Sequence, residues 1–116
     1  MANTFKVVTK ANISSADVVY TVASSTTAVV LGLVLGNTTS TSSNATVTLT
    51  SDTANRAGNN DEANETVELL TATPIPGNST LEIFEGQKLV LEATDSLTCT
   101  FSGSNCDVAL SVMEIT

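Results

Sequence analysis

Residues 27–36 read Thr-Ala-Val-Val-Leu-Gly-Leu-Val-Leu-Gly and form the most apolar run in the chain. A regular strand here has two apolar faces, one made by Val29, Leu31, Leu33 and Leu35 and the other by Val30, Gly32, Val34 and Gly36. Such a strand is either central in its sheet or covered by a neighbour. The Val-Gly face is shallow, which suits the close approach of another surface. An ordinary sandwich strand beneath a loop is the alternative.

Short runs with a period of two residues flank this strand on both sides. The predicted strands cover residues 5–10, 17–22, 27–36, 46–50, 65–72, 81–84, 88–91, 98–101 and 108–113. We expect one shared face for Val18, Tyr20 and Val22, and inward positions for Val47 and Leu49 and for Val67 and Leu69. The strongest turn signal, residues 74–78 (Pro-Ile-Pro-Gly-Asn), should interrupt pairing.

Strands at a spacing of roughly 8–12 residues are typical of sandwiches and jelly rolls. The sequence therefore predicts an all-β fold, a single-domain antiparallel β-sandwich or jelly roll of about eight strands over residues 1–116. The last two predicted strands should close the chain as a hairpin.

The residue types argue against catalysis. The chain has no histidine and no tryptophan, and aromatic residues make up 3% of it. Serine or cysteine nucleophiles therefore lack the usual imidazole base, and there are too few rings to line a sugar-binding cleft. We expect neither an enzyme nor a bound cofactor.

Charge and hydropathy exclude two classes of partner. Twelve acidic residues outnumber Lys6, Lys10, Arg56 and Lys88, giving a net charge of −8. Nucleic acids and anionic membranes both attract clustered cations, which this sequence lacks. Residues 1–6 do not resemble a signal peptide, and the apolar stretch 28–35 is far shorter than the roughly 20 residues that cross a bilayer.

The two cysteines flank a predicted turn at Ser102-Gly103. In a hairpin with this turn, Cys99 and Cys106 lie directly opposite one another, at Cα separations of about 4.5–5.5 Å that a disulfide accepts. Two interpretations stay open: a Cys99–Cys106 disulfide, or two buried thiols in a reducing cytosol. Two thiols without a histidine do not make a zinc site.

Residues 51–64 are predicted to form a long polar surface loop. Its oxygen-bearing side chains include Asp52, Asn59, Asn60, Asp61 and Glu62, with Glu65 following. Calcium prefers such ligands, but their spacing matches no EF-hand, so a solvated acidic loop is favoured and no metal is expected. A loop of this length is also a candidate partner contact.

The N-terminal segment is predicted to be an edge strand. Residues 2–10 carry two of the four basic residues and would be able to add a strand to a neighbouring sheet. The candidate interface therefore comprises Phe5, Val7, Val30, Gly32, Val34 and Gly36.

Two blocks of sequence, with the C-terminal residues, resemble small β-sandwich virion proteins of tailed bacteriophages, especially phages of marine cyanobacteria. The blocks are residues 21–37 (TVASSTTAVVLGLVLGN) and 74–97 (PIPGNSTLEIFEGQKLVLEATDSL), and the ending is 107–116 (DVALSVMEIT). The shared pattern is a turn with Ile-Pro, a strand, a Gly-containing turn, Leu-Glu-Ala-x-Asp, and a final Ser-x-x-Glu-Ile. The cysteine-flanked segment and the acidic loop lie outside this pattern.

The resemblance implies a structural role in a particle assembled in the host cytoplasm, with the virion as location. It implies a capsid decoration (cement) protein, homo-oligomeric, with the major capsid protein as partner. Placement in the tail, neck or fibre is the alternative, with the proteins of those parts as partners. A carbohydrate- or surface-binding module is the second alternative.

Overall fold

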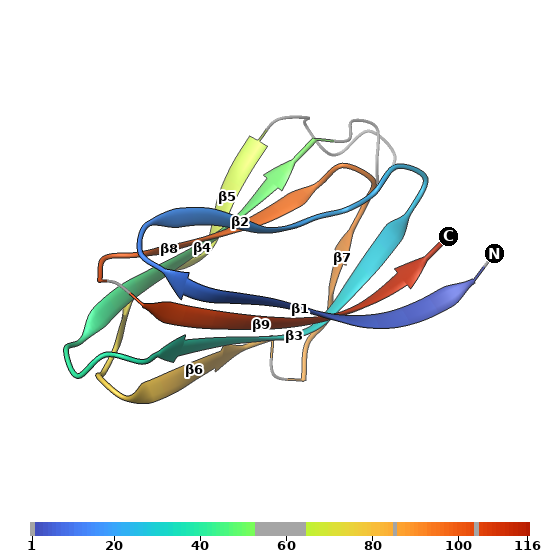
Figure 1. Ribbon diagram of the computed structural model, residues 1–116. Coiled ribbons are helices and arrows are strands. Elements are labelled where there is room, and N and C mark those ends of the chain that lie inside the picture. Colours follow the sequence, from blue (N-terminus) through green and yellow to red (C-terminus); the bar gives the residue numbers. More distant parts are fainter. Residues whose placement is uncertain (1, 53–64, 85, 104) are drawn as a thin grey trace.

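The structure is a computed structural model that describes residues 2–52, 65–84, 86–103 and 105–116. In these ranges the chain forms nine strands and no helix (Figure 1). The strands are β1 (Asn3–Ile13), β2 (Ala16–Thr21), β3 (Thr27–Asn37), β4 (Ser43–Ser51), β5 (Glu65–Ile75), β6 (Ser79–Ile83), β7 (Leu89–Leu91), β8 (Ser96–Phe101) and β9 (Cys106–Ile115).

The strands form two antiparallel sheets that pack face to face. Sheet A has the order β1-β9-β3-β6, with β7 also pairing with β3, and sheet B has the order β2-β8-β4-β5. All strand pairs are antiparallel. The predicted all-β sandwich is therefore confirmed. The two ends of the chain lie side by side, because the main chains of Ala2 and Thr116 exchange two hydrogen bonds of 3.0 and 3.1 Å.

The core between the sheets is mainly aliphatic, as the composition predicts. Its buried apolar side chains come from eight of the nine strands and from Val22, and Phe101 is the one aromatic ring among them. Strand β5 contributes Ile75, and β1 contributes only Ile13, at its end. Residues 3–12 of β1 thus place no fully buried side chain in the core.

Strand β3 contains a bulge that changes which side chains face the core. Val30 pairs with Val112 of β9 and Gly32 with Ser111, so Leu31 is an extra residue in this ladder. Alternation therefore shifts by one position after the bulge. The predicted faces of residues 27–36 are wrong on this point: Val30 is fully buried, whereas Gly32, Val34 and Gly36 lie on the outer side with Val29.

A second bulge overturns the predicted face of β2. The pairing with β8 shifts between Val18 and Tyr20, and Val19 becomes the buried residue while Val18 is 49% exposed. In β5, Val67 is also 49% exposed, because this edge strand is incompletely covered. Pro74 does not interrupt β5 but pairs with Asn44, which an edge strand permits since its other side needs no donor.

The predicted C-terminal hairpin is also wrong. Strand β8 pairs with β2 and β4 in sheet B, and β9 pairs with β1 and β3 in sheet A. The connection between them therefore crosses from one sheet to the other. The turn signal at Ser102-Gly103 fits both geometries, because each needs a reversal at this position.

Buried polar side chains fix the loops at the ends of the sandwich. Asn37 is 2% exposed, and its amide donates to the carbonyls of Thr41 (2.8 Å) and Ile75 (3.0 Å). Gly77 approaches the main chain of Ser40 so closely that an added Cβ would lie 2.4 Å from the Ser40 carbonyl carbon. The β3–β4 loop and the β5–β6 turn are thus held against each other.

Asp95 performs the same task at the opposite end. It is completely buried, and its two carboxylate oxygens accept from the amides of Asp52 (2.9 Å) and Glu92 (3.0 Å). Its carbonyl accepts from Val22. Asp95 therefore connects three segments. Its side chain binds the end of β4 and the β7–β8 turn, and its main-chain carbonyl binds the β2–β3 loop.

Replacing Asp95 by alanine should destabilise the protein by about 2–3 kcal/mol, because two partly buried amides lose their hydrogen-bond acceptor. Urea unfolding followed by far-UV circular dichroism measures this loss. Glu65→Ala, at an exposed position of β5, is the matched control and should change stability by less than about 0.5 kcal/mol. Equal effects of the two substitutions would contradict the anchoring role of Asp95.

Candidate interaction surface

The outer side of sheet A carries a row of apolar residues from four strands. Residues opposite one another in an antiparallel pair lie on the same face. Phe5 of β1 is opposite Met113 of β9, Met113 is opposite Val29 of β3, and Val29 is opposite Val90 of β7. We call these four residues the apolar row. It crosses the sheet from the β1 edge to the β7 edge.

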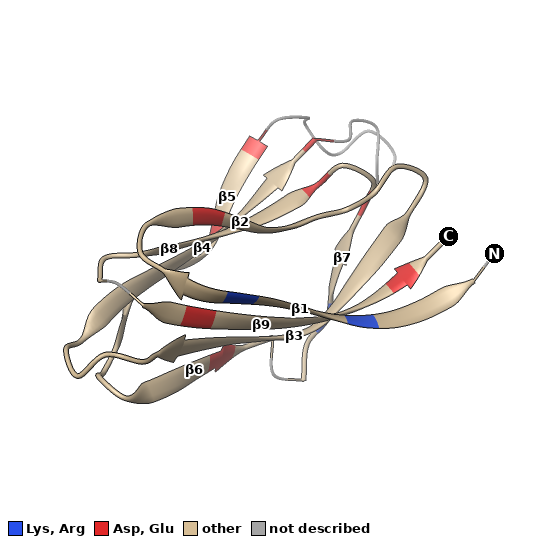
Figure 2. Ribbon diagram, viewed as in Figure 1, with Lys and Arg blue, Asp and Glu red and all other residues tan. Residues whose placement is uncertain are grey.

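Several of these side chains are open to solvent. Phe5 is 70% exposed and Val90 is 55% exposed. Val7, two residues after Phe5 on the same face of β1, is 64% exposed. Figure 2 shows the charged residues of sheet A mostly toward strand ends and on the edge strands β1 and β6. Exposed apolar residues on one sheet face are typical of interaction surfaces, since one side of an antiparallel sheet is normally polar.

A depression lies beside this row, where two strands share one edge of β3. β7 pairs with Val30 and the residues before it, and β6 pairs with Leu33 and the residues after it. Neither ladder includes the bulge. The resulting hollow has a volume of about 310 Å³, and we call it the notch. Its lining includes Leu31, Gly32, Val34, Glu82, Ile83 and Phe84.

The notch is open at Gly32, where an added Cβ would meet no atom within 4 Å. Val34 and Glu82 pair with each other and line the notch on the same outer side of sheet A as the apolar row. The row and the notch therefore form one continuous surface. Phe5 protrudes at one edge of this surface and the notch indents the other.

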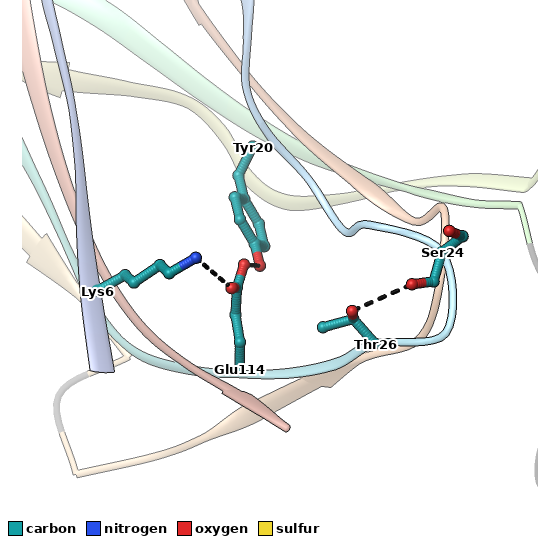
Figure 3. A network of polar contacts seen from close by, with 5 residues as sticks. All are labelled: Lys6, Tyr20, Ser24, Thr26 and Glu114. Carbon is teal, nitrogen blue, oxygen red and sulfur yellow. Dashed lines mark hydrogen bonds and ion pairs between the residues drawn. The ribbon is translucent and has the colours of Figure 1, made fainter. Parts of the chain in front are cut away.

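Strand β1 is attached to the sandwich by a polar cluster that bridges the two sheets (Figure 3). The Glu114 carboxylate lies 2.8 Å from Lys6 Nζ and accepts a 2.6 Å hydrogen bond from the Tyr20 hydroxyl. Lys6 and Glu114 belong to sheet A and Tyr20 to β2 of sheet B. Nearby, Thr26 Oγ1 donates to the Ser24 carbonyl and shapes the β2–β3 turn.

This cluster shifts two pKa values in opposite directions. Hydrogen bonds from Lys6 and Tyr20 hold the pKa of Glu114 below its ordinary value. Burial, and then the hydrogen bond to Glu114, raises the pKa of Tyr20 well above its ordinary value. Both shifts favour the arrangement seen, an ionised Glu114 beside a protonated Tyr20.

The Glu114 contact should stabilise the fold only where its carboxylate is ionised. A lowered folded-state pKa gives stability above the unfolded pKa of about 4.3, which is lost as the pH falls through the folded value. Urea midpoints of Glu114→Gln and the unsubstituted protein should therefore differ at pH 7, and the difference should shrink as the pH falls below about 4.3. A difference that is independent of pH would show that the carboxylate charge plays no part.

The structure places most of the predicted interface residues on this surface. Phe5 and Val7 are exposed, and Gly32, Val34 and Gly36 are half-buried on the outer side. Val30 belongs to the core. The remaining members, Met113, Val29 and Val90, were missed because only the pairing register of strands distant in sequence brings them together.

The two cysteines are free thiols in different sheets. Cys99 lies opposite Asp17 and Val47, and Cys106 lies opposite Ile13 and Asn37. The predicted direct opposition of the two is therefore wrong. Their predicted inward orientation is confirmed, because both are completely buried. Burial raises the pKa of Cys99 to about 12, and it also raises that of Cys106.

Neither thiol should react readily in the folded protein, because the thiolate is the nucleophile. Iodoacetamide at pH 8 should label both residues at least about tenfold more slowly in buffer than in 8 M urea. Mass spectrometry of tryptic peptides measures each site separately. Rapid native labelling of either cysteine would show that its strand opens easily.

No group of three or more potential metal ligands occurs among the described residues. The loop expected at residues 51–64 lies outside them except for Ser51 and Asp52, so the Asn59–Glu62 segment has no structural account. The described ranges contain no helix of the length and hydropathy needed to cross a membrane.

Comparison with known proteins gives one distant structural likeness. No protein-family model matches the chain, and no curated protein sequence matches it. A solved structure of Bacillus endospore appendages, described as a novel family of disulfide-linked pili, is similar over 99% of this chain and 87% of that one. The identity is 14% and the TM-score 0.48, and a likeness of this size carries no functional argument.

Proposed function

We propose that this chain is a structural subunit of a virion, without catalytic activity, and that it decorates the capsid of a tailed phage. The observation that carries this proposal is the apolar row on the outer side of sheet A. Burial of such a surface against another protein favours association by about 25 cal/mol per Å² of apolar area removed from water. The major capsid protein is the proposed partner.

The segments that resemble phage virion proteins support this assignment by their location. The first, residues 21–37, contains β3; the second, residues 74–97, contains β6 and β7; and the ending, residues 107–116, lies in β9. These four strands, with β1, make up sheet A. The resemblance therefore falls on the strands that build the candidate interaction surface.

Cryo-EM of virions purified from the host that makes this chain tests the proposal. We expect copies of the sandwich on the outside of the capsid shell, with the outer side of sheet A covered by a neighbouring protein. Density on the tail, neck or fibre would instead support the alternative placement. Absence of the chain from purified virions would overturn the proposal, and specific binding on a glycan array would then favour a carbohydrate-binding module.

Val90→Asp should weaken association with particles at least about tenfold, because a carboxylate in a buried apolar contact is strongly unfavourable. Val90 is 55% exposed, so the isolated domain should stay folded. Co-sedimentation with particles that lack the chain measures binding. The matched control is Val18→Asp, at a 49% exposed valine of sheet B, and it should bind normally. Equal losses in both variants would point to general charge repulsion.

A further inference from the structure

We propose that two copies of this chain bind each other by exchanging residues 3–10 of β1, so that β1 of each copy pairs with β9 of the other. The inference goes beyond the proposed function and does not rest on it, because it uses the edge of β9 and not the outer side of sheet A. The structure itself shows which segment fits this edge, since β1 covers it within one chain. Three features of the described residues support an exchange.

The first feature is that β1 can leave the sandwich without disturbing its core. Of residues 3–12, eight are exposed, and only Val8 and Lys10 are half-buried. Among the described strands β1 pairs with β9 alone, so its departure breaks no other strand pair. The main chain of β9 then presents an unpaired edge, which is a template for another strand. A strand that contributes so little burial is suited to exchange between identical copies.

The second feature is a hinge at the end of the exchanged segment. The ladder with β9 shifts between Lys10 and Ile13, so the two residues between them form a bulge. In this bulge Asn12 has a φ of 59°, in the left-handed region that non-glycine residues seldom adopt. Opening at the bulge allows this residue to relax. Ile13, which is 4% exposed, stays in the core beyond the hinge and holds the rest of the chain in place.

The third feature is the match between β1 and the edge of β9 on a second copy. Exchange forms the same register on the partner, with the same contact between Lys6 Nζ and Glu114 (2.8 Å). Tyr20 completes this cluster from the other sheet. Residues 1–10 hold two lysines and no acid, whereas residues 11–116 hold all twelve acids and two cations. An opened β1 is therefore attracted to the body of a second copy.

The free edge of β1 is less suited to pairing with a second copy. Lys6 and Lys10 lie on the core-facing side of β1, because their partners on β9, Val112 and Val108, are buried. Charges that point inward from an edge strand oppose the addition of another strand. Two β1 strands placed edge to edge would also bring these lysines together, with no acid on either strand. Exchange avoids both effects, because each lysine keeps its present surroundings.

Cross-linking between two singly substituted chains tests the exchange. Val7 and Ser111 are exposed and directly opposite one another, a geometry that a disulfide accepts. A Val7→Cys chain and a Ser111→Cys chain are unfolded together in urea with a reductant, refolded at high concentration and then oxidised. Neither chain can form this disulfide internally. Because paired strands hold the thiols at a high effective concentration, we expect at least about tenfold more mixed disulfide than from Val18→Cys with Ser111→Cys.

A chain that carries both Val7→Cys and Ser111→Cys provides a second measurement. Oxidation at high dilution ties β1 to its own β9 and covers no other surface of the sandwich. Sedimentation velocity should then show only monomers of this locked chain, whereas the unsubstituted chain refolded at high concentration should contain dimers. Reduction and refolding of the locked chain should restore the dimers. The native cysteines are completely buried, so a mixture of Val7→Cys with the unsubstituted chain should form no cross-link.

Two outcomes would overturn the inference. A mixed disulfide that does not exceed its control would show that β1 of one copy does not pair with β9 of another. Dimers that persist in the locked chain would show that the copies associate through a different surface. Neither outcome bears on the capsid proposal, which cryo-EM and the Val90→Asp variant test separately.

Discussion

The extra residue at Leu31 is the constraint on which the rest of sheet A depends. Without it, one face of β3 would alternate from Val30 through Gly36 and leave Leu33 and Leu35 outside. With it, Val30 and Leu35 both face the core, so the two halves of the strand are buried. The same extra residue separates the segments of β3 that pair with β7 and β6. The buried core and the notch therefore have a common origin.

Strand β1 is held differently from the other strands. Its residues 3–12 supply no fully buried side chain, so hydrophobic burial contributes little to its attachment. Its ladder with β9 and the Lys6–Glu114–Tyr20 cluster hold it instead. Elements with few buried apolar contacts open most easily in native proteins. The strand with the most exposed aromatic side chain is thus also weakly anchored to the core.

Sequence periodicity predicts the strands because buried and exposed side chains alternate along most of them. It fails at Val30 and Val18, because a bulge in each strand changes which side chains face the core. Where apolar residues occur on both faces, the sequence pattern does not reveal such a bulge. It also fails for Cys99 and Cys106, because a turn signal does not tell which sheet the next strand joins. The apolar row was only partly predictable: Phe5 is recognisable on an edge strand, whereas Met113 and Val90 join it through long-range register.

The pairing of Ala2 with Thr116 has a consequence for how the chain folds. The β1–β9 ladder pairs Asn3 with Ile115, so it closes a loop that contains all the other strands. Closing such loops slows folding, because native contacts between distant residues raise the contact order. A short linker between the adjacent termini, with new ends opened at another loop, would turn β9 and β1 into a local hairpin. Circular permutation of this sandwich would therefore lower its contact order and speed its folding while preserving the same two sheets.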